Sequence, residues 1–170
     1  MKTSTTSAYL QFALDAAWQA GRITLGHFQT GVHADRKGDN TPVTIADQQA
    51  EQKIRSLIEQ YWPDHAIHGE EFGKSQTNAR YTWIIDPIDG TKSFISGVPL
   101  YSTLIALMDG EEAVLGVIHL PALNETVYAV RGGGCFWNGR TAHVSDVATL
   151  AEATALCSEM ESLARYGRLA

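Results

Sequence analysis

The chain has 170 residues, of which 44% are hydrophobic and 19% are charged, a composition typical of a globular domain and unlike that of a disordered segment. Its net charge is −6 and no run of basic residues offsets it, which argues against nucleic-acid binding. Because it has neither a signal-peptide core nor an apolar run of transmembrane length, we expect one cytoplasmic domain over residues 1–170 without membrane contact.

A first helix is predicted near the start of the chain, with Ser7 as its N-cap. Apolar residues then recur at steps of three and four, the spacing of one face of an amphipathic helix. The expected buried face consists of Leu10, Leu14, Trp18, Gly21, Leu25 and Phe28. A short alternating segment at 32–36 is strand-like, and the polar residues at 37–42 are typical of a loop.

A second helix is predicted after this loop. Thr44 and Asp47 have the spacing of a capping box, with Asp in place of the usual Glu. Pro63 ends the helix. Its expected buried stripe is Ala50, Ile54, Leu57, Ile58 and Tyr61. The two helices are therefore expected to form a hairpin on one side of the domain.

Beyond Pro63 the hydrophobic pattern changes from helical to strand-like. Strands are expected at 66–73, 81–86, 102–110, 113–120 and 125–130. Asn138-Gly139 indicates a further hairpin, and the segments 142–145 and 153–158 are candidates for two more short strands. The predicted fold class is α+β, with two N-terminal helices packed on a mostly antiparallel sheet of about six strands.

The stretch DPIDGTKS at 86–93 places Asp86 and Asp89 three residues apart, directly after an apolar strand. Asp-Pro and Asp-Gly are both turn dipeptides, so a surface turn with solvated acids is one interpretation. The other is a metal site, because clustered carboxylate oxygens and a nearby backbone carbonyl suit Mg²⁺. Glu70 and Glu71, in the segment GEEFG, supply further carboxylates and favour the metal interpretation.

Gly90 and Thr91 fit the same chemistry. A glycine lets a phosphate approach the backbone, where successive N–H groups can hold it. A threonine hydroxyl beside a bound water can orient that water for attack. The two cysteines, Cys135 and Cys157, have no metal-ligand spacing and are expected to be reduced thiols.

GEE followed by WIIDPIDGT resembles the motifs of the inositol monophosphatase family. The members of this family are Mg²⁺-dependent phosphomonoesterases. The resemblance covers nearly the whole chain and includes KGDNTPVTIAD, DPIDGTKSFISGVPLYSTLIAL and GVIHLPALNETVYAVRGGGCFWNG. Lys-Ser-Phe followed by GVPLYSTLIAL is more similar to the histidinol-phosphatase branch than to the inositol-phosphate branch, where Thr-Asn-Phe is usual. The resemblance implies that this chain forms the N-terminal half of the family's layered α/β sandwich.

This resemblance also implies roles for the metal-site residues. Glu70, Asp86 and the Ile88 carbonyl would bind a first Mg²⁺, and Asp86 and Asp89 a second. Glu70 and Thr91 would position the attacking water.

The same resemblance assigns the surrounding residues. The Gly90 and Thr91 amides would hold the phosphate, and Asp47 would be hydrogen-bonded to Thr91. Glu71 would support the ligands without contacting the ion, or would be solvated. Lys37 would lie on a loop that closes over the site, or be a solvated lysine.

The expected function is hydrolysis of L-histidinol phosphate in histidine biosynthesis, with inositol-1-monophosphate hydrolysis as the alternative. The small phosphorylated substrate and a homodimeric state also follow from the resemblance. The family carries a further ligand Asp in a Trp-Asp motif, whereas the tryptophans here are followed by Gln, Pro, Ile and Asn. A third possibility is therefore a catalytically incomplete metal-binding fragment that lacks the C-terminal half.

Overall fold

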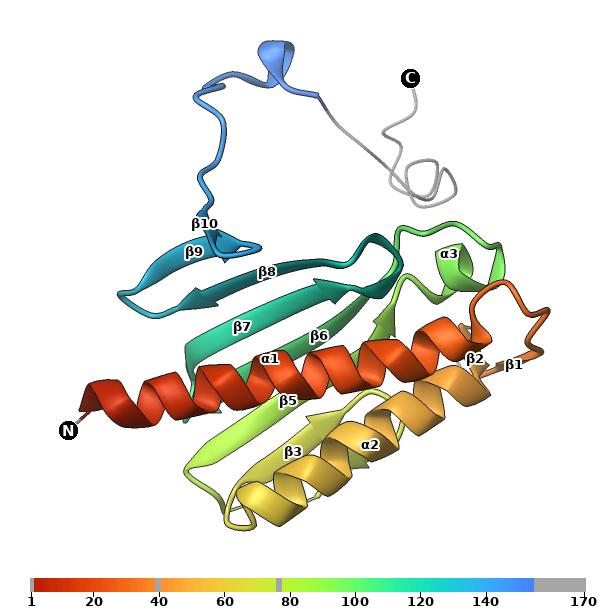
Figure 1. Ribbon diagram of the computed structural model, residues 1–170, viewed down its shortest axis with the longest axis horizontal. Helices are drawn as coiled ribbons and strands as arrows, with labels where there is room; N and C mark the ends of the chain where they lie inside the picture. Colours follow the sequence, from red (N-terminus) through yellow and green to blue (C-terminus); the bar gives the residue numbers. More distant parts are fainter. Residues whose placement is uncertain (1, 39–40, 76–77, 155–170) are drawn as a thin grey trace.

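The computed structural model describes residues 2–38, 41–75 and 78–154. Figure 1 shows its elements in the order of the chain. The helices are α1 (Lys2–His27), α2 (Ile45–Tyr61), α3 (Thr91–Ile95) and the 3₁₀ turns η1 (Pro121–Leu123) and η2 (Leu150–Glu152). The strands are β1 (Ala34–Arg36), β2 (Pro42–Thr44), β3 (Ala66–Gly69), β4 (Gly73–Lys74), β5 (Tyr81–Asp89), β6 (Ser102–Asp109), β7 (Glu112–Leu120), β8 (Glu125–Val130), β9 (Gly134–Trp137) and β10 (Arg140–Thr141). Within these ranges no helix is long and apolar enough to cross a membrane.

Eight of the described strands form one sheet in the order β10-β9-β8-β7-β6-β5-β3-β4, and β1 and β2 form a separate hairpin. All neighbours in the large sheet are antiparallel except β3 and β5, which are parallel. The predicted α+β class with a mostly antiparallel sheet is thus confirmed. The strand expected at 142–145 is wrong, because β10 ends at Thr141, and most of the segment 153–158 lies outside the described residues.

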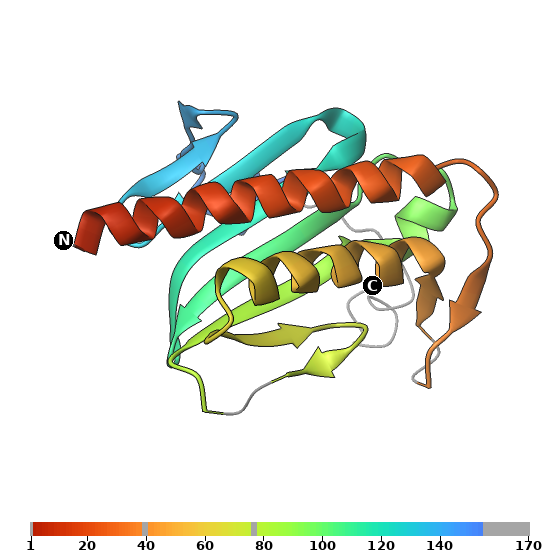
Figure 2. The ribbon, with the colours of Figure 1, turned by 60° about the horizontal axis from the view of Figure 1, so that its bottom comes forward.

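Both long helices lie side by side on the same face of this sheet, as Figures 1 and 2 show. The predicted buried face of α1 is wrong in part, because Trp18 and Leu25 are 50% and 40% exposed. The side chains that α1 buries completely are small ones, and they allow the helix axis to approach α2 and the sheet closely. They are Ala13, Ala16, Ala17, Ala20 and Thr24.

Helix α2 begins as its sequence predicts. The Thr44 side chain accepts a hydrogen bond from the first turn, and the Asp47 carboxylate accepts one from the Thr44 backbone N–H. These contacts satisfy N–H groups that have no partner within the helix. The predicted stripe is buried up to Ile58, whereas Tyr61 is 58% exposed and its ring contacts that of Phe12 on α1.

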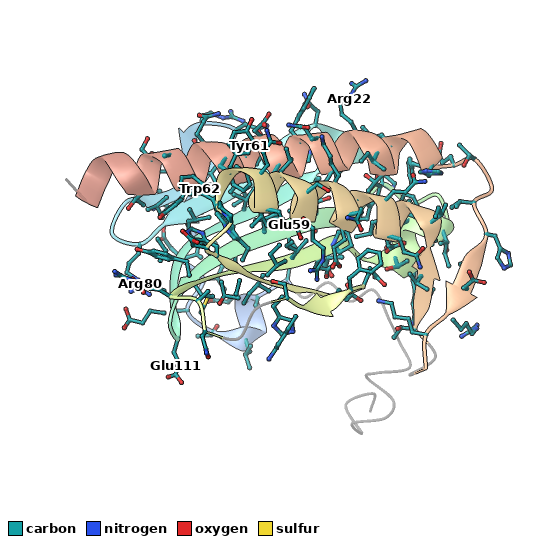
Figure 3. The ribbon with its side chains drawn as sticks, turned by 90° about the horizontal axis from the view of Figure 1, so that it is seen from below. Arg22, Glu59, Tyr61, Trp62, Arg80 and Glu111 are labelled. Atoms are coloured by element: carbon teal, nitrogen blue, oxygen red, sulfur yellow. The ribbon has the colours of Figure 1, made fainter. Side chains whose placement is uncertain are left out.

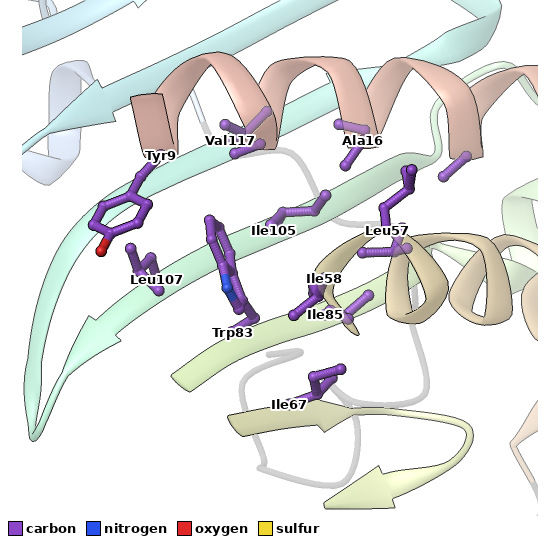
Figure 4. Close-up of a cluster of buried hydrophobic side chains, with 14 of the residues drawn as sticks. Tyr9, Ala16, Leu57, Ile58, Ile67, Trp83, Ile85, Ile105, Leu107 and Val117 are labelled. Carbon is purple, nitrogen blue, oxygen red and sulfur yellow. The ribbon is translucent and has the colours of Figure 1, made fainter. Parts of the chain in front are cut away.

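The main core fills the space between the helices and the sheet (Figure 4). At its centre the Trp83 ring is completely buried, and its indole N–H donates to Nδ1 of His65 at 3.0 Å. Leu107 and Val117, from β6 and β7, extend this core across the sheet. The ring of His65 also stacks on that of Trp62, which holds this histidine against the core.

The close packing of α1 can be tested with Ala17→Leu. Adding three carbon atoms at a fully buried position should lower the free energy of unfolding by about 1–3 kcal/mol, because the neighbouring side chains must move. Urea unfolding followed by circular dichroism measures this. Ala8→Leu, at an exposed position of the same helix, should change stability by less than about 0.5 kcal/mol. Equal effects of the two substitutions would contradict the packing described here.

Candidate metal and phosphate site

The segment Asp86–Asp89 is a bulged end of β5 and not a separate turn. Asp86 pairs with Leu104 and Asp89 with Ser102, so two residues of β5 face one residue of β6. The extra residue bends the strand, and such bulges are among the few places where a sheet accepts a proline. The hydroxyl of Thr103 donates to the Pro87 carbonyl at 2.9 Å and fixes this bend.

Gly90 follows the bulge in the left-handed conformation, with φ of 92°. A Cβ atom there would lie 3.2 Å from the Leu100 carbonyl oxygen, so the conformation favours glycine and the space is tight for any other residue. Thr91 then begins the short helix α3, and its hydroxyl donates to the Ile88 carbonyl at 3.1 Å. The bulge and the following turn are thus tied together.

Glu70 reaches this segment through the parallel pair of strands. Gly69, the last residue of β3, pairs with Ile85, and the Glu70 N–H donates to the Ile85 carbonyl at 3.1 Å. Because the carboxyl ends of parallel neighbours meet at one edge, Glu70 comes to lie beside Asp86. A cavity of about 280 Å³ results, and six of the predicted metal- and phosphate-site residues line it. They are Glu70, Asp86, Ile88, Asp89, Gly90 and Thr91.

Asp86 is the electrostatic centre of this cavity. Burial, a hydrogen bond to Glu70 and the negative charges of Glu70 and Asp89 raise the pKa of Asp86 to about 8. Its Oδ1 atom is buried and has no hydrogen-bond partner among the described residues. An unsatisfied carboxylate oxygen beside two other carboxylates is an arrangement that a divalent cation would stabilise.

In the described part of the chain, however, no three His, Cys, Asp or Glu side chains converge closely enough to enclose an ion by themselves. Ile88 lines the same cavity, and its carbonyl oxygen, which accepts the Thr91 hydroxyl, is the further oxygen expected there. Mg²⁺ commonly keeps several waters and binds through one or two carboxylates together with substrate phosphate. The residues therefore fit an open Mg²⁺ site.

Lys37 lies at the tip of the hairpin formed by β1 and β2, and its ammonium contacts two carboxylates of the site. Its Nζ lies 2.7 Å from Oε1 of Glu70 and 2.8 Å from Oε1 of Glu71. Although burial lowers it, these hydrogen bonds and charges raise the pKa of Lys37 above its ordinary value. Lys37 is therefore paired with two carboxylates, and the Glu71 side chain is buried and paired, not solvated.

The carboxylate of Asp47 has a different hydrogen-bond partner from the one expected. Its Oδ2 accepts hydrogen bonds from the backbone N–H of Thr44 at 2.8 Å and from the Thr44 hydroxyl at 2.6 Å. Burial nevertheless raises the pKa of Asp47, partly offset by these bonds. The Thr91 hydroxyl bonds to Ile88 instead, so the predicted Asp47–Thr91 hydrogen bond is not among those of the described residues.

Glu51 is a residue that sequence reasoning missed. Its carboxylate is completely buried and accepts the backbone N–H groups of Glu71 at 2.7 Å and Phe72 at 3.2 Å. Arg55 donates to the same carboxylate at 2.7 Å and also contacts the Gly73 carbonyl. The sequence does contain a signal for this ion pair, because Glu51 and Arg55 lie one turn apart beside the apolar stripe of α2.

Gly69 explains how the loop approaches Glu51 so closely. A Cβ atom at this position would lie 1.9 Å from Oε1 of Glu51, which no side chain permits. The buried carboxylate therefore acts as an anchor on α2 for the loop that carries Glu70 and Glu71.

A sequence model of the inositol monophosphatase family matches residues 6–166. The chain belongs to the inositol monophosphatase family.

Its relatives in this family include a histidinol-phosphatase from Chlorobaculum parvum, 46% identical over 155 residues, which are 91% of this chain and 60% of that protein. A histidinol-phosphatase from Streptomyces coelicolor is 39% identical over 171 residues, covering 94% of this chain and 64% of that protein. The solved structure of a Thermotoga maritima IMPase superposes with a TM-score of 0.79 at 36% identity, covering 84% of this chain and 56% of that one. This chain thus spans 60–64% of the length of the two histidinol-phosphatases.

The anchor on α2 of this family member can be tested with Glu51→Ala. The substitution leaves the buried Arg55 guanidinium unpaired and removes the acceptor for two backbone N–H groups. Loss of one partner of a buried pair should lower the free energy of unfolding by about 3–5 kcal/mol in urea. Glu59→Ala, at an exposed position of the same helix (Figure 3), should change it by less than about 0.5 kcal/mol. A small effect at Glu51 would show that the loop does not depend on it.

The raised pKa of Asp86 predicts a pH dependence in the absence of divalent ions. Because the folded state holds this proton more tightly than the unfolded state does, the contribution of Asp86 to stability is greatest at low pH. It falls as the pH rises from about 4 to about 8. Asp86→Asn removes this titration, so the variant should gain stability relative to the original protein as the pH rises. Urea unfolding between pH 4.5 and 8.5 with EDTA measures the difference, and parallel curves would contradict the assignment.

Proposed function

We propose that this family member is a Mg²⁺-dependent phosphomonoesterase that hydrolyses L-histidinol phosphate to L-histidinol and phosphate. The observation that carries the proposal is the buried, unpartnered Asp86 oxygen in a cavity shared with Glu70, Asp89, Gly90 and Thr91. The ester is inferred from the two relatives named histidinol-phosphatase, at 46% and 39% identity.

Glu70, Asp86, the Ile88 carbonyl and Asp89 would hold the Mg²⁺ ions. When bound, Mg²⁺ supplies a water with a lowered pKa and neutralises the charge that develops on the phosphoryl oxygens. Asp86, Ile88 and Asp89 lie on β5, and Glu70 directly follows its parallel neighbour β3, so backbone pairing brings all four to one edge of the sheet.

The remaining residues would position the reactants. Glu70 and Thr91 would orient the attacking water, and the hydrogen bond from Thr91 to Ile88 holds the hydroxyl beside the proposed ligands. The left-handed turn at Gly90 leaves the backbone free of side-chain atoms where the phosphate would meet the Gly90 and Thr91 N–H groups. Asp47 would contribute indirectly, by capping α2 through Thr44.

Lys37 would serve as a movable cation near the substrate. Its ammonium contacts Glu70, one of the proposed ligands, so Mg²⁺ and the lysine would compete for the same carboxylate. Movement of the β1–β2 hairpin would release Lys37 to face the phosphate instead.

A second candidate is a metal-binding fragment without turnover. The observation in its favour is that the matched region is only 60% of the Chlorobaculum parvum relative. Inositol-1-monophosphate is the alternative substrate, favoured by the similarity to the Thermotoga maritima IMPase.

The proposed reaction predicts Mg²⁺-dependent phosphate release from histidinol phosphate, faster than release from inositol 1-phosphate. Asp89→Asn should reduce release by at least about 100-fold, since even outer partners of metal ligands contribute 10–100-fold. Asp15→Asn, on the exposed side of α1, should leave the rate unchanged. Calorimetry with Mg²⁺ accompanies the assay. Mg²⁺ binding without release would favour the incomplete fragment, and release that persists in Asp89→Asn or in EDTA would refute the proposed site.

A further inference from the structure

The bulge at the end of β5 decides which way its two aspartates face. In a regular strand the side chains alternate between two faces, so residues three apart point to opposite faces. Here Asp86 pairs with Leu104 and Asp89 pairs with Ser102. Leu104 and Ser102 lie two residues apart on β6 and share a face, and directly paired residues share a face as well. The extra residue of the bulge therefore turns Asp89 to the same face as Asp86.

A hydroxyl group of β6 holds this bulge in place. Pro87 and Ile88 both lie opposite Thr103, between the two regular pairs. A bulge disrupts the backbone ladder locally, and proline has no N–H to contribute to it. The Thr103 hydroxyl donates to the Pro87 carbonyl at 2.9 Å, and the Thr103 side chain is completely buried, so water does not compete for this bond.

The preceding residue of β6 contacts the bulge from the other face of the sheet. Successive side chains of a strand point to opposite faces, so Ser102 lies on the face of the two aspartates and Thr103 on the reverse. The Ser102 hydroxyl donates to Oδ2 of Asp89 at 3.4 Å, and Ser102 is buried. This distance is long for a bond between two oxygen atoms, so the contact is weaker than that of Thr103.

We propose that Thr103 and Ser102 are positioning residues that set the affinity of the proposed metal site for Mg²⁺. The inference rests on the proposed function, which requires that site. Thr103 acts through the bulge that brings Asp86 and Asp89 together, and Ser102 acts through the Asp89 carboxylate. Neither hydroxyl-bearing residue lines the acidic cavity, so each works through a ligand and not on the ion itself.

The chemistry of Mg²⁺ makes its binding sensitive to such positioning. This ion demands near-octahedral geometry with oxygen ligands at about 2.0–2.1 Å, so a small rotation of one carboxylate weakens binding. Groups that orient metal ligands from behind typically contribute about 10–100-fold to metal affinity. A merely structural role of the two hydroxyls would instead lower stability and leave the Mg²⁺ affinity of the folded chain unchanged.

Calorimetric titration with MgCl₂ separates these two roles. Thr103→Val removes the hydroxyl and keeps the shape of the side chain, and we expect it to raise the Kd for Mg²⁺ by about tenfold. Ser102→Ala should raise the Kd by a smaller factor, because its hydrogen bond is longer. Thr103→Ser keeps the donor and should restore most of the affinity.

Thr126→Val is the matched control. The Thr126 hydroxyl lies 2.9 Å from Nδ1 of His119, on a strand that is separated from β6 by β7. This substitution also removes a threonine hydroxyl from a hydrogen bond within the same sheet, and it should leave the Kd for Mg²⁺ unchanged.

Hydrogen exchange in EDTA tests the bulge without any metal. In Thr103→Val the backbone amides of residues 88–90 should exchange about fivefold faster, the factor expected for loss of one hydrogen bond. Thr126→Val should leave the exchange of these amides unchanged.

Three results would overturn the inference. They are a Thr103→Val variant that binds Mg²⁺ as tightly as the original chain, a Thr103→Ser variant as weak as Thr103→Val, and unchanged exchange at residues 88–90. An original chain that binds no Mg²⁺ would refute the proposed site and this inference together. If the original chain binds Mg²⁺ but releases no phosphate, weaker binding by Thr103→Val still supports the inference while the proposed reaction fails.

Discussion

Gly69 of β3 and Ile85 of β5 pair in the parallel ladder of the large sheet, and the site depends on this pairing. It brings two carboxylates, one following each of these residues, to the same edge although sixteen positions separate them in the sequence. If these two strands were antiparallel, the residues that follow Gly69 and Ile85 would lie in opposite directions along the sheet. The bulge of β5 and the turn at Gly90 then add Asp89, the Ile88 carbonyl and Thr91 to the same cavity.

Bringing carboxylates together raises the electrostatic energy of the folded chain, and the structure offsets it in three ways. Asp86 retains its proton, as its raised pKa indicates. Lys37 places its ammonium between Glu70 and Glu71. Behind them, the Glu51 carboxylate is neutralised by Arg55 and so can hold the loop without adding an unpaired charge. A divalent cation would replace the first two of these, so its binding would be coupled to release of a proton and of the lysine.

The sequence was sufficient where structure is local. The capping box of Thr44 and Asp47, the stripe from Ala50 to Ile58 and the glycine after the acidic segment all depend on neighbours within a few residues. The sequence was insufficient where contacts with residues distant in the chain determine the structure. The buried face of α1 consists mainly of alanines, because close approach of the helix to α2 and the sheet outweighs the gain from burying Trp18.

The acidic segment shows the same limit. It contains two turn dipeptides, yet pairing with β6 through Leu104 and Ser102 keeps it in the sheet as a bulge. The cavity brings together the residues proposed as metal and phosphate ligands, which the family resemblance named, while the hydrogen bonds of Asp47 and the buried Glu51 emerge only from the fold. Asp86 also lines a groove of about 440 Å³ whose other lining residues are almost all apolar, so its carboxyl group lies between this polar cavity and hydrophobic surface. Burial among these groups favours the protonated form of Asp86, whereas a bound divalent cation would favour the ionised form, so the environment of this one residue would decide between proton and metal.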